Sequence, residues 1–134
     1  MMIASLDGER VVNIGGSDIW FSVYSTAKVA FRSRKNLIDK AMVFMERGEC
    51  DWRDGFEIAR QFNLIRDEFA KIPPEKAIYD VNNRKKEAPW ANNISPVITS
   101  CANLFTTADG QDLLFEVVSI LVYAQVKKVG IEVE

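Results

Sequence analysis

Hydrophobic residues recur every three or four positions in four stretches of the chain, and this spacing predicts helices. The predicted helices cover residues 18–30, 36–47, 52–71 and 110–128. In the first, Trp20, Tyr24 and Ala27 follow a helical stripe, and the hydroxyl of Ser17 is placed to cap it. A shorter alternation within residues 19–23 would suit a strand, but the longer stripe favours a helix.

Residues with special backbone preferences mark the ends of these helices. Gly48 stops the second helix, Asp51 is placed to cap the third, and Pro73 and Pro74 end it. The last helix is apolar on most of its sides, which is typical of a helix that other elements cover. We therefore expect residues 110–128 to form the central helix.

Runs of β-branched or alternating apolar residues predict strands near residues 10–14, 76–81 and 129–133. The segment 88–96 contains two prolines and is expected to be an ordered loop, with Ser95 and Pro96 beginning another short helix. The sequence therefore predicts an α+β fold in which about four helices pack on a small sheet of about three strands.

Composition places the chain among ordinary globular domains, with 48% hydrophobic and 27% charged residues. Its 134 residues match one domain, residues 1–134. A formal net charge of −2 lacks the basic footprint of a general nucleic-acid binder. Two cysteines, Cys50 and Cys101, are too few for a disulfide framework or a zinc motif, and they indicate a reducing compartment.

Neither a targeting segment nor a membrane span is predicted. Residues 1–10 lack the apolar centre of a signal peptide, and polar residues interrupt the apolar-rich stretch 113–126, which is too short to cross a bilayer. We therefore expect a cytoplasmic protein with no membrane role.

Candidate catalytic residues are few. The chain has no histidine, which removes the side chain most used for proton transfer near neutral pH and the commonest metal ligand. A carboxylate pair such as Asp80 and Asp109 would suit a small hydrolase only if both lay in one pocket. No glycine-rich phosphate loop is present. We expect no enzyme activity, no cofactor and no bound metal.

A contact surface for another protein is the more promising site. One group of acidic residues, close in sequence, would attract a basic partner; it comprises Glu46, Glu49, Asp51, Asp54 and Glu57. Trp90, in a loop between two prolines, is the tryptophan best placed to contact a partner, and Asn92 and Asn93 follow it. The two amides would otherwise hydrogen-bond the backbone of their own loop.

Three spaced motifs resemble a known family. They are Ile72-Pro-Pro-Glu-Lys-Ala-Ile-Tyr-Asp80, Ala88-Pro-Trp-Ala-Asn-Asn-Ile-Ser-Pro96 and Asn103-Leu-Phe-Thr-Thr-Ala-Asp-Gly110. In this order they resemble the bacterial immunity protein 70 family of polymorphic toxin systems, including contact-dependent growth inhibition. The resemblance is good over positions 72 to 115, whereas residues 32–36 and the loop 82–87 depart from it.

The resemblance implies a non-enzymatic antitoxin that binds a cognate toxin domain in the cytoplasm and blocks it. A nuclease toxin with a basic cleft would suit the acidic balance of the chain. We expect no direct contact with nucleic acid, and a monomer or a weak homodimer. A further alternative is a homo-oligomeric regulatory or structural module that pairs through an exposed edge strand at residues 129–133.

Overall fold

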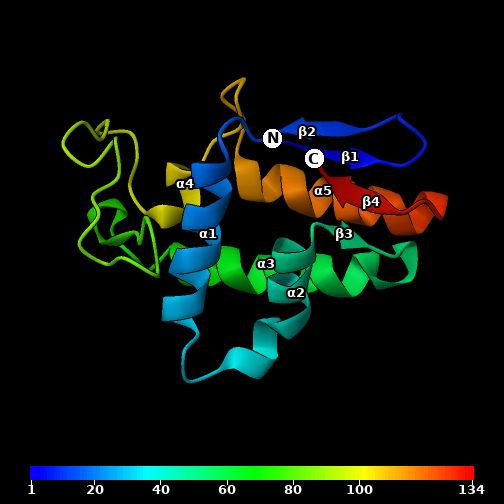
Figure 1. Ribbon diagram of the computed structural model, residues 1–134, viewed down its shortest axis with the longest axis horizontal. Coiled ribbons are helices and arrows are strands. Elements are labelled where there is room, and N and C mark those ends of the chain that lie inside the picture. Colours follow the sequence, from blue (N-terminus) through cyan, green and yellow to red (C-terminus); the bar gives the residue numbers. More distant parts are fainter.

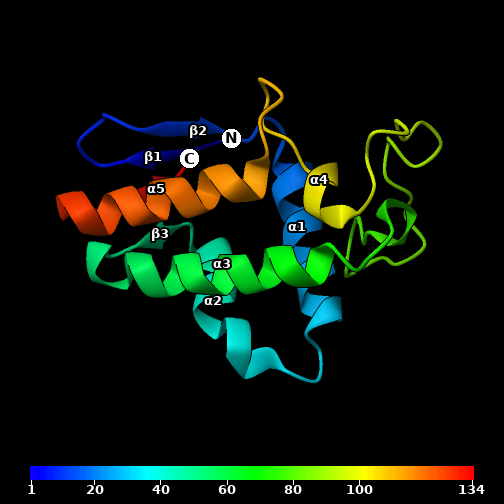
Figure 2. The same ribbon diagram turned by 180° about the vertical axis from the view of Figure 1, so that it is seen from behind.

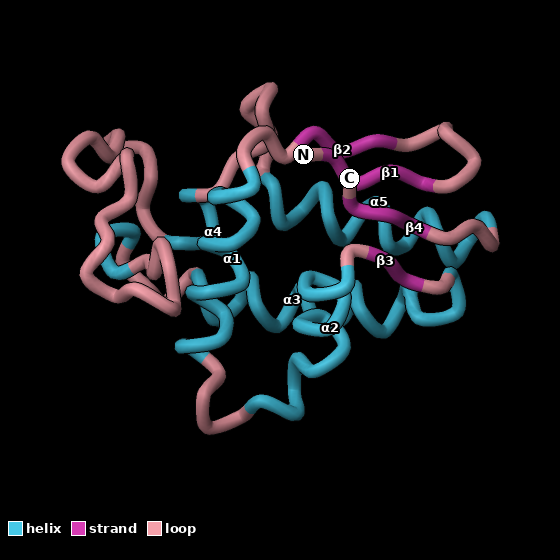
Figure 3. The backbone as a smooth tube through the Cα atoms, in the orientation of Figure 1, coloured by secondary structure: helices cyan, strands magenta, loops and turns pink.

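The computed structural model describes residues 1–134 and contains one four-stranded antiparallel sheet. Its strands are β1 (Met2–Ser5), β2 (Val11–Asn13), β3 (Glu49–Cys50) and β4 (Ile131–Val133). They lie in the order β2-β1-β4-β3, so the first and last strands of the chain are neighbours and the termini lie close together (Figures 1 and 3). Gly8, with φ of 75°, supplies the left-handed residue in the turn between β1 and β2.

Five α-helices and three short 3₁₀ turns complete the fold. The helices are α1 (Ser17–Ala30), α2 (Asp39–Arg47), α3 (Gly55–Phe69), α4 (Cys101–Leu104) and α5 (Leu113–Lys127). The 3₁₀ turns are Lys35–Ile38, Trp52–Asp54 and Pro74–Lys76, and the first two lead directly into α2 and α3. The predicted α+β class is confirmed.

The helix ends follow from local chemistry, with one correction. Gly48 closes α2 in the left-handed region, and the Asp51 carboxylate accepts from the Arg53 N–H, both as expected. The predicted cap of α1 is wrong: Gly16 is the N-cap residue, and Ser17 is the first residue of the helix and caps nothing. Asp112 caps α5 by accepting from the Phe115 N–H.

Helices α3 and α5 run side by side in opposite directions and form one layer of the molecule (Figure 2). The sheet, α1 and α2 pack on the other side of that layer (Figure 1). The two helices approach closely at Gly55, where an added Cβ would clash with the carbonyl oxygen of Leu121. Between the layers lies the core of 25 buried residues, in which the rings of Trp20, Phe44 and Phe62 contact one another.

The strand predicted at residues 76–81 is absent. The backbone there finds its hydrogen bonds on α1: Ser22 Oγ donates to the Ile78 carbonyl at 2.8 Å, and Ser25 Oγ accepts from the Val81 N–H at 3.0 Å. Thr26 Oγ1 accepts from the Ile78 N–H at 3.0 Å. Three buried hydroxyls therefore replace a neighbouring strand, and the β-rich composition of the segment serves to pack it against a helix.

Two other predicted elements also need correction. No helix begins at Ser95; instead α4 begins after Ser100, whose side chain makes a capping box with Asn103. The terminal strand β4 is not an edge, because β1 and β3 pair with its two sides. The exposed edge required by the homo-oligomer alternative is thus missing at that strand.

Helix α5 is only partly covered, contrary to the prediction. One side faces the core, but Phe115, Val122 and Val126 are exposed on the other. No helix of the structure has the length and apolar composition needed to cross a membrane.

Candidate functional site

A groove lies where α2, β3, β4 and the 3₁₀ turn before α3 meet, and these elements are on the side that faces the viewer in Figure 1. Its volume is about 630 Å³. Apolar side chains from separate elements line its inner part, among them Phe44, Ile58 and Ile131. We call this feature the acidic groove, because five carboxylates line it: Asp39, Glu49, Asp51, Asp54 and Glu132.

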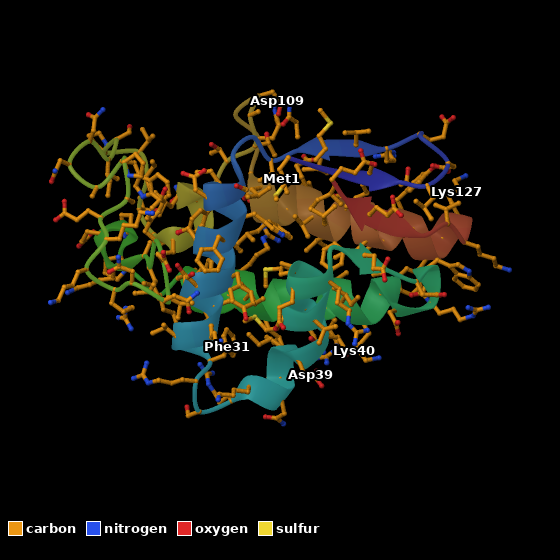
Figure 4. The ribbon with its side chains drawn as sticks, viewed as in Figure 1. Met1, Phe31, Asp39, Lys40, Asp109 and Lys127 are labelled. Carbon is orange, nitrogen blue, oxygen red and sulfur yellow. The ribbon has the colours of Figure 1, made fainter.

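Two cations also line the acidic groove, Lys40 and Arg47. Lys40 Nζ donates to Asp54 Oδ1 at 3.3 Å, and Figure 4 shows Lys40 beside Asp39 at the start of α2. Asp51 has a cation as well, since Arg53 Nη1 lies 3.1 Å from one of its oxygens. Both ion pairs are about half exposed, so water screens them and each is worth at most ~1 kcal/mol.

Glu49 and Glu132 are different, because neither takes part in an ion pair. They are directly opposite each other in the β3–β4 ladder, so both side chains lie on the same face of the sheet. Both are exposed and both line the acidic groove. Like charges opposite each other across a strand pair destabilise a sheet, so this arrangement is electrostatically unfavourable in the isolated protein.

Cys50, next to Glu49, also lines the acidic groove. Burial raises the pKa of its thiol to about 11, and the charges of Asp54 and Asp51 add to the effect. A thiol with such a pKa is almost entirely protonated at neutral pH and is a poor nucleophile. Cys50 therefore contributes packing to the groove and no reactivity.

Trp52 forms a further part of the groove wall. The guanidinium carbon of Arg53 lies 4.9 Å from the centre of its ring, and Lys128 Nζ lies 5.8 Å away. The indole is half-buried, and both cations lie within cation–π distance of it.

Of the acidic residues predicted to form one surface, the structure brings together Glu49, Asp51 and Asp54 but not the other two. Glu46 lies outside the groove and accepts a hydrogen bond from the hydroxyl of Tyr24 at 3.3 Å. Glu57 is also outside it and is paired with Arg60, whose hydrogen bonds lower the pKa of Glu57 to about 2.

The structure adds two carboxylates that the sequence did not single out, Asp39 and Glu132. Glu132 is far from the acidic group in sequence and joins it only because β4 pairs with β3. Its one signal in the sequence is its outward position in the alternating segment 129–133.

Trp90, Asn92 and Asn93 lie in the long connection between α3 and α4, which projects beyond α1 at the opposite end of the molecule from β3 and β4 (Figure 1). Trp90 is half-buried and packs edge-on against Tyr79 and Phe105, so it anchors the loop. Asn92 and Asn93 are exposed, and their side chains make no hydrogen bond to the loop. The loop and the acidic group are two separate surfaces.

Asp80 and Asp109 do not form a shared site. The Asp80 carboxylate accepts from the Asn82 N–H, and the Asp109 carboxylate accepts from the Thr107 hydroxyl in the turn before α5 (Figure 4). The main pockets include neither carboxylate. No observation of this structure therefore favours the carboxylate hydrolase alternative.

Residues 6–133 match the sequence model of a family described as Immunity protein 70. The chain belongs to the Immunity protein 70 family. No curated protein and no solved structure matches the chain. The match extends from Leu6 to beyond Glu132 and so includes every residue of the acidic groove. The family membership expected from the three motifs is confirmed, and membership of an immunity protein family implies a toxin as partner.

Proposed function

We propose that this member of the Immunity protein 70 family is a non-enzymatic antitoxin that binds a cognate toxin domain in the cytoplasm through the acidic groove. The observation that carries the proposal is the position of Glu49 and Glu132 in the groove: the two carboxylates lie opposite each other, and neither forms an ion pair. Two like charges that repel each other in the free protein gain most from a partner that places a cation between them.

The groove also has the mixed character of a protein contact site. Its apolar inner part offers area for hydrophobic burial, with Leu6 at the rim 62% exposed and Val43 42% exposed. Its excess of carboxylates over cations attracts a basic partner and raises the association rate. A lysine- or arginine-rich segment of the toxin fits this chemistry, and the cleft of a nuclease is one such surface.

Inhibition then needs no chemistry from the antitoxin. By occupying a basic cleft, the protein excludes the toxin's substrate or holds the toxin in an inactive arrangement. A chain without histidine, and with its one groove thiol held protonated, is suited to such a role.

The test is titration calorimetry of the purified protein with the toxin domain encoded immediately upstream, at two salt concentrations. We expect tight binding that weakens with salt. Glu49→Gln and Glu132→Gln should each raise Kd about tenfold, the effect of losing ~1.4 kcal/mol of interaction with a cation. The matched control is Asp67→Asn, an equal charge change at an exposed position of α3 outside the groove.

Three outcomes would count against the proposal. Absence of toxin binding, or failure to rescue cells that express the toxin, would remove the antitoxin function. Equal effects of Asp67→Asn and the two groove variants would remove the groove as the site. A loss of affinity on Asn92→Ala and Asn93→Ala alone would place the contact at the Trp90 loop instead.

A further inference from the structure

Helix α5 carries an exposed apolar stripe on the side that faces away from the core. Phe115 is 51% exposed, Val122 38% and Val126 61%, and Ser119 lies between the first two. The spacing of four, three and four residues places all of them along one side of the helix. Exposing this apolar stripe to water is energetically unfavourable, and most helix surfaces do not expose such a stripe.

A neighbouring side chain on α3 extends the stripe. Phe56 is 49% exposed, and its N–H donates to Gln125 Oε1 at 2.7 Å, which fixes it beside the C-terminal half of α5. At the other end, the guanidinium carbon of Arg66 lies 5.6 Å from the centre of the Phe115 ring. No other element covers this side of the α3–α5 layer, which faces the viewer in Figure 2. We call this surface the α5 face.

The charges beside the stripe are arranged so that the surface complements itself. Glu116 and Lys127 are separated by about three helical turns, so both lie along the same flank of α5, one near each end. Figure 4 shows Lys127 at the far end of α5 from Asp109. Neither Glu116 nor Lys127 takes part in an ion pair.

We infer that the α5 face binds a second copy of this chain, with the two α5 helices antiparallel about a twofold axis. The axis is perpendicular to the helix and passes between Ser119 and Val122. This rotation places Phe115 of one copy over Val126 of the other. It also places Glu116 of each copy opposite Lys127 of its partner, so two ion pairs lie along one side of the apolar contact, one near each end.

The geometry favours a second copy over a different protein as occupant. The stripe has the large Phe115 at one end, the smaller Val126 at the other and the small Ser119 near its middle. An antiparallel second copy therefore places each large side chain against a smaller one. The dimer leaves the acidic groove free, because the groove and the α5 face lie on opposite sides of the molecule (Figures 1 and 2). This inference is independent of toxin binding.

The experiment is sedimentation velocity of the full chain over a wide concentration range, with Glu116→Lys and Lys127→Glu studied singly and mixed. The unaltered protein should dimerise reversibly. Each single variant places like charges opposite each other near both ends of that flank in its own dimer, so its dimer Kd should rise about tenfold. An equimolar mixture of the two variants should dimerise like the unaltered protein, because the heterodimer restores both opposite-charge contacts.

The control is Glu87→Lys, a charge reversal of the same size as Glu116→Lys in the loop between α3 and α4; it should leave dimerisation unchanged. Circular dichroism checks that every variant folds. A chain that stays monomeric at all concentrations, or variants whose mixture associates no better than either alone, would overturn the inference. Reduced association of the Glu87→Lys control to the same extent would do so too.

Discussion

Almost all polar side-chain atoms buried in this protein have hydrogen-bond partners, whereas the opposed carboxylates of Glu49 and Glu132 at the surface take part in no ion pair. The buried amide of Gln61 accepts from the Ala41 N–H at 2.8 Å and donates to Asp39, so it joins α2 to α3. Among the buried side-chain nitrogen and oxygen atoms, only the indole Nε1 of Trp20 has no hydrogen-bond partner. The repulsion between Glu49 and Glu132 in the groove therefore lowers the stability of the free protein, and no ion pair offsets it.

That cost leads to a stability prediction. Glu132→Gln keeps the size of the side chain and removes one of two opposed charges, so we expect the free protein to gain about 0.2–1 kcal/mol of unfolding free energy. The same change should weaken toxin binding. Urea unfolding of the two proteins at low salt measures the gain, and high salt should reduce it.

A control separates the specific repulsion from the effect of net charge. Asp67→Asn alters the net charge equally but removes no opposed carboxylate, and it should change the unfolding free energy by less than Glu132→Gln. If Glu132→Gln instead destabilises the free protein, the carboxylate has a structural role. The prediction that one charge lowers stability while it strengthens toxin binding is then wrong.

At the scale of elements, the hydroxyls on one side of α1 hold the segment after α3. Ser22 and Thr26 contact the backbone of Ile78, and Ser25 contacts that of Val81. All three hydroxyl residues are buried. They position the start of the connection that carries Trp90, and Tyr79 adds a hydrogen bond to Asp18 at 2.8 Å.

Removing these hydroxyls should therefore loosen one segment more than the whole fold. Thr26→Val keeps the shape of the side chain but leaves the Ile78 N–H without an acceptor, at a cost of about 1–3 kcal/mol. Hydrogen exchange should accelerate at Ile78 while the amides of α3 and α5 keep their protection.

The exposed Ser17, whose side chain forms no hydrogen bond, provides the control. Ser17→Ala should leave exchange at Ile78 unchanged. Equal acceleration in α3, α5 and the segment on Thr26→Val would show that the connection and the helical core unfold together, contrary to this account.

Much of this arrangement follows from periodicity, and the exceptions have physical reasons. The four longer helices were predictable because a one-sided apolar stripe is a local property of the sequence. The segment 76–81 resembled a strand because β-branched residues suit any packed extended backbone, and its partners on α1 are distant in sequence. The hairpin of β1 and β2 does have a local signal in the sequence, the turn dipeptide Asp7-Gly8.

The candidate site was half predictable for the same reason. Asp51 and Asp54 are close in sequence and meet in the groove, but Glu132 reaches Glu49 only through the strand order, which local patterns do not encode. Glu57 lies close to them in sequence, yet its place in α3 pairs it with Arg60 outside the groove.

At the scale of the whole molecule, the titratable groups set a pH range of constant stability. The chain has no histidine, so no unperturbed side chain changes charge between about pH 5 and about pH 8. On the acid side, hydrogen bonds lower the pKa of Asp7, chiefly from Ser5, and that of Glu57, chiefly from Arg60. On the alkaline side, burial raises the pKa of Cys50 to about 11 and that of Cys101 to about 12.

The direction of each pKa shift determines the pH range in which stability is lost. Carboxylates with lowered pKa values stabilise the fold above their unfolded pKa, and this contribution is lost as the pH falls through the folded value. The thiols behave oppositely: their contribution is complete below the unfolded pKa of 9.0 and is lost as the pH rises towards about 11 and about 12. Tyr79 and Tyr123, whose pKa values are raised because they donate to Asp18 and Asp7, act in the same direction above pH 10.0.

We therefore expect the melting temperature to be flat from about pH 5 to about pH 8, to fall below about pH 4, and to fall from about pH 9 upward. Thermal unfolding by circular dichroism across this range measures it. Cys101→Ala should lower the melting temperature at neutral pH, because it leaves a small void in the core, yet it should lose less stability between neutral pH and pH 10 than the unaltered protein. An unchanged alkaline slope in that variant would mean that the buried thiol stays protonated in the unfolded chain as well, so that the tyrosines and Cys50 alone set the alkaline limit.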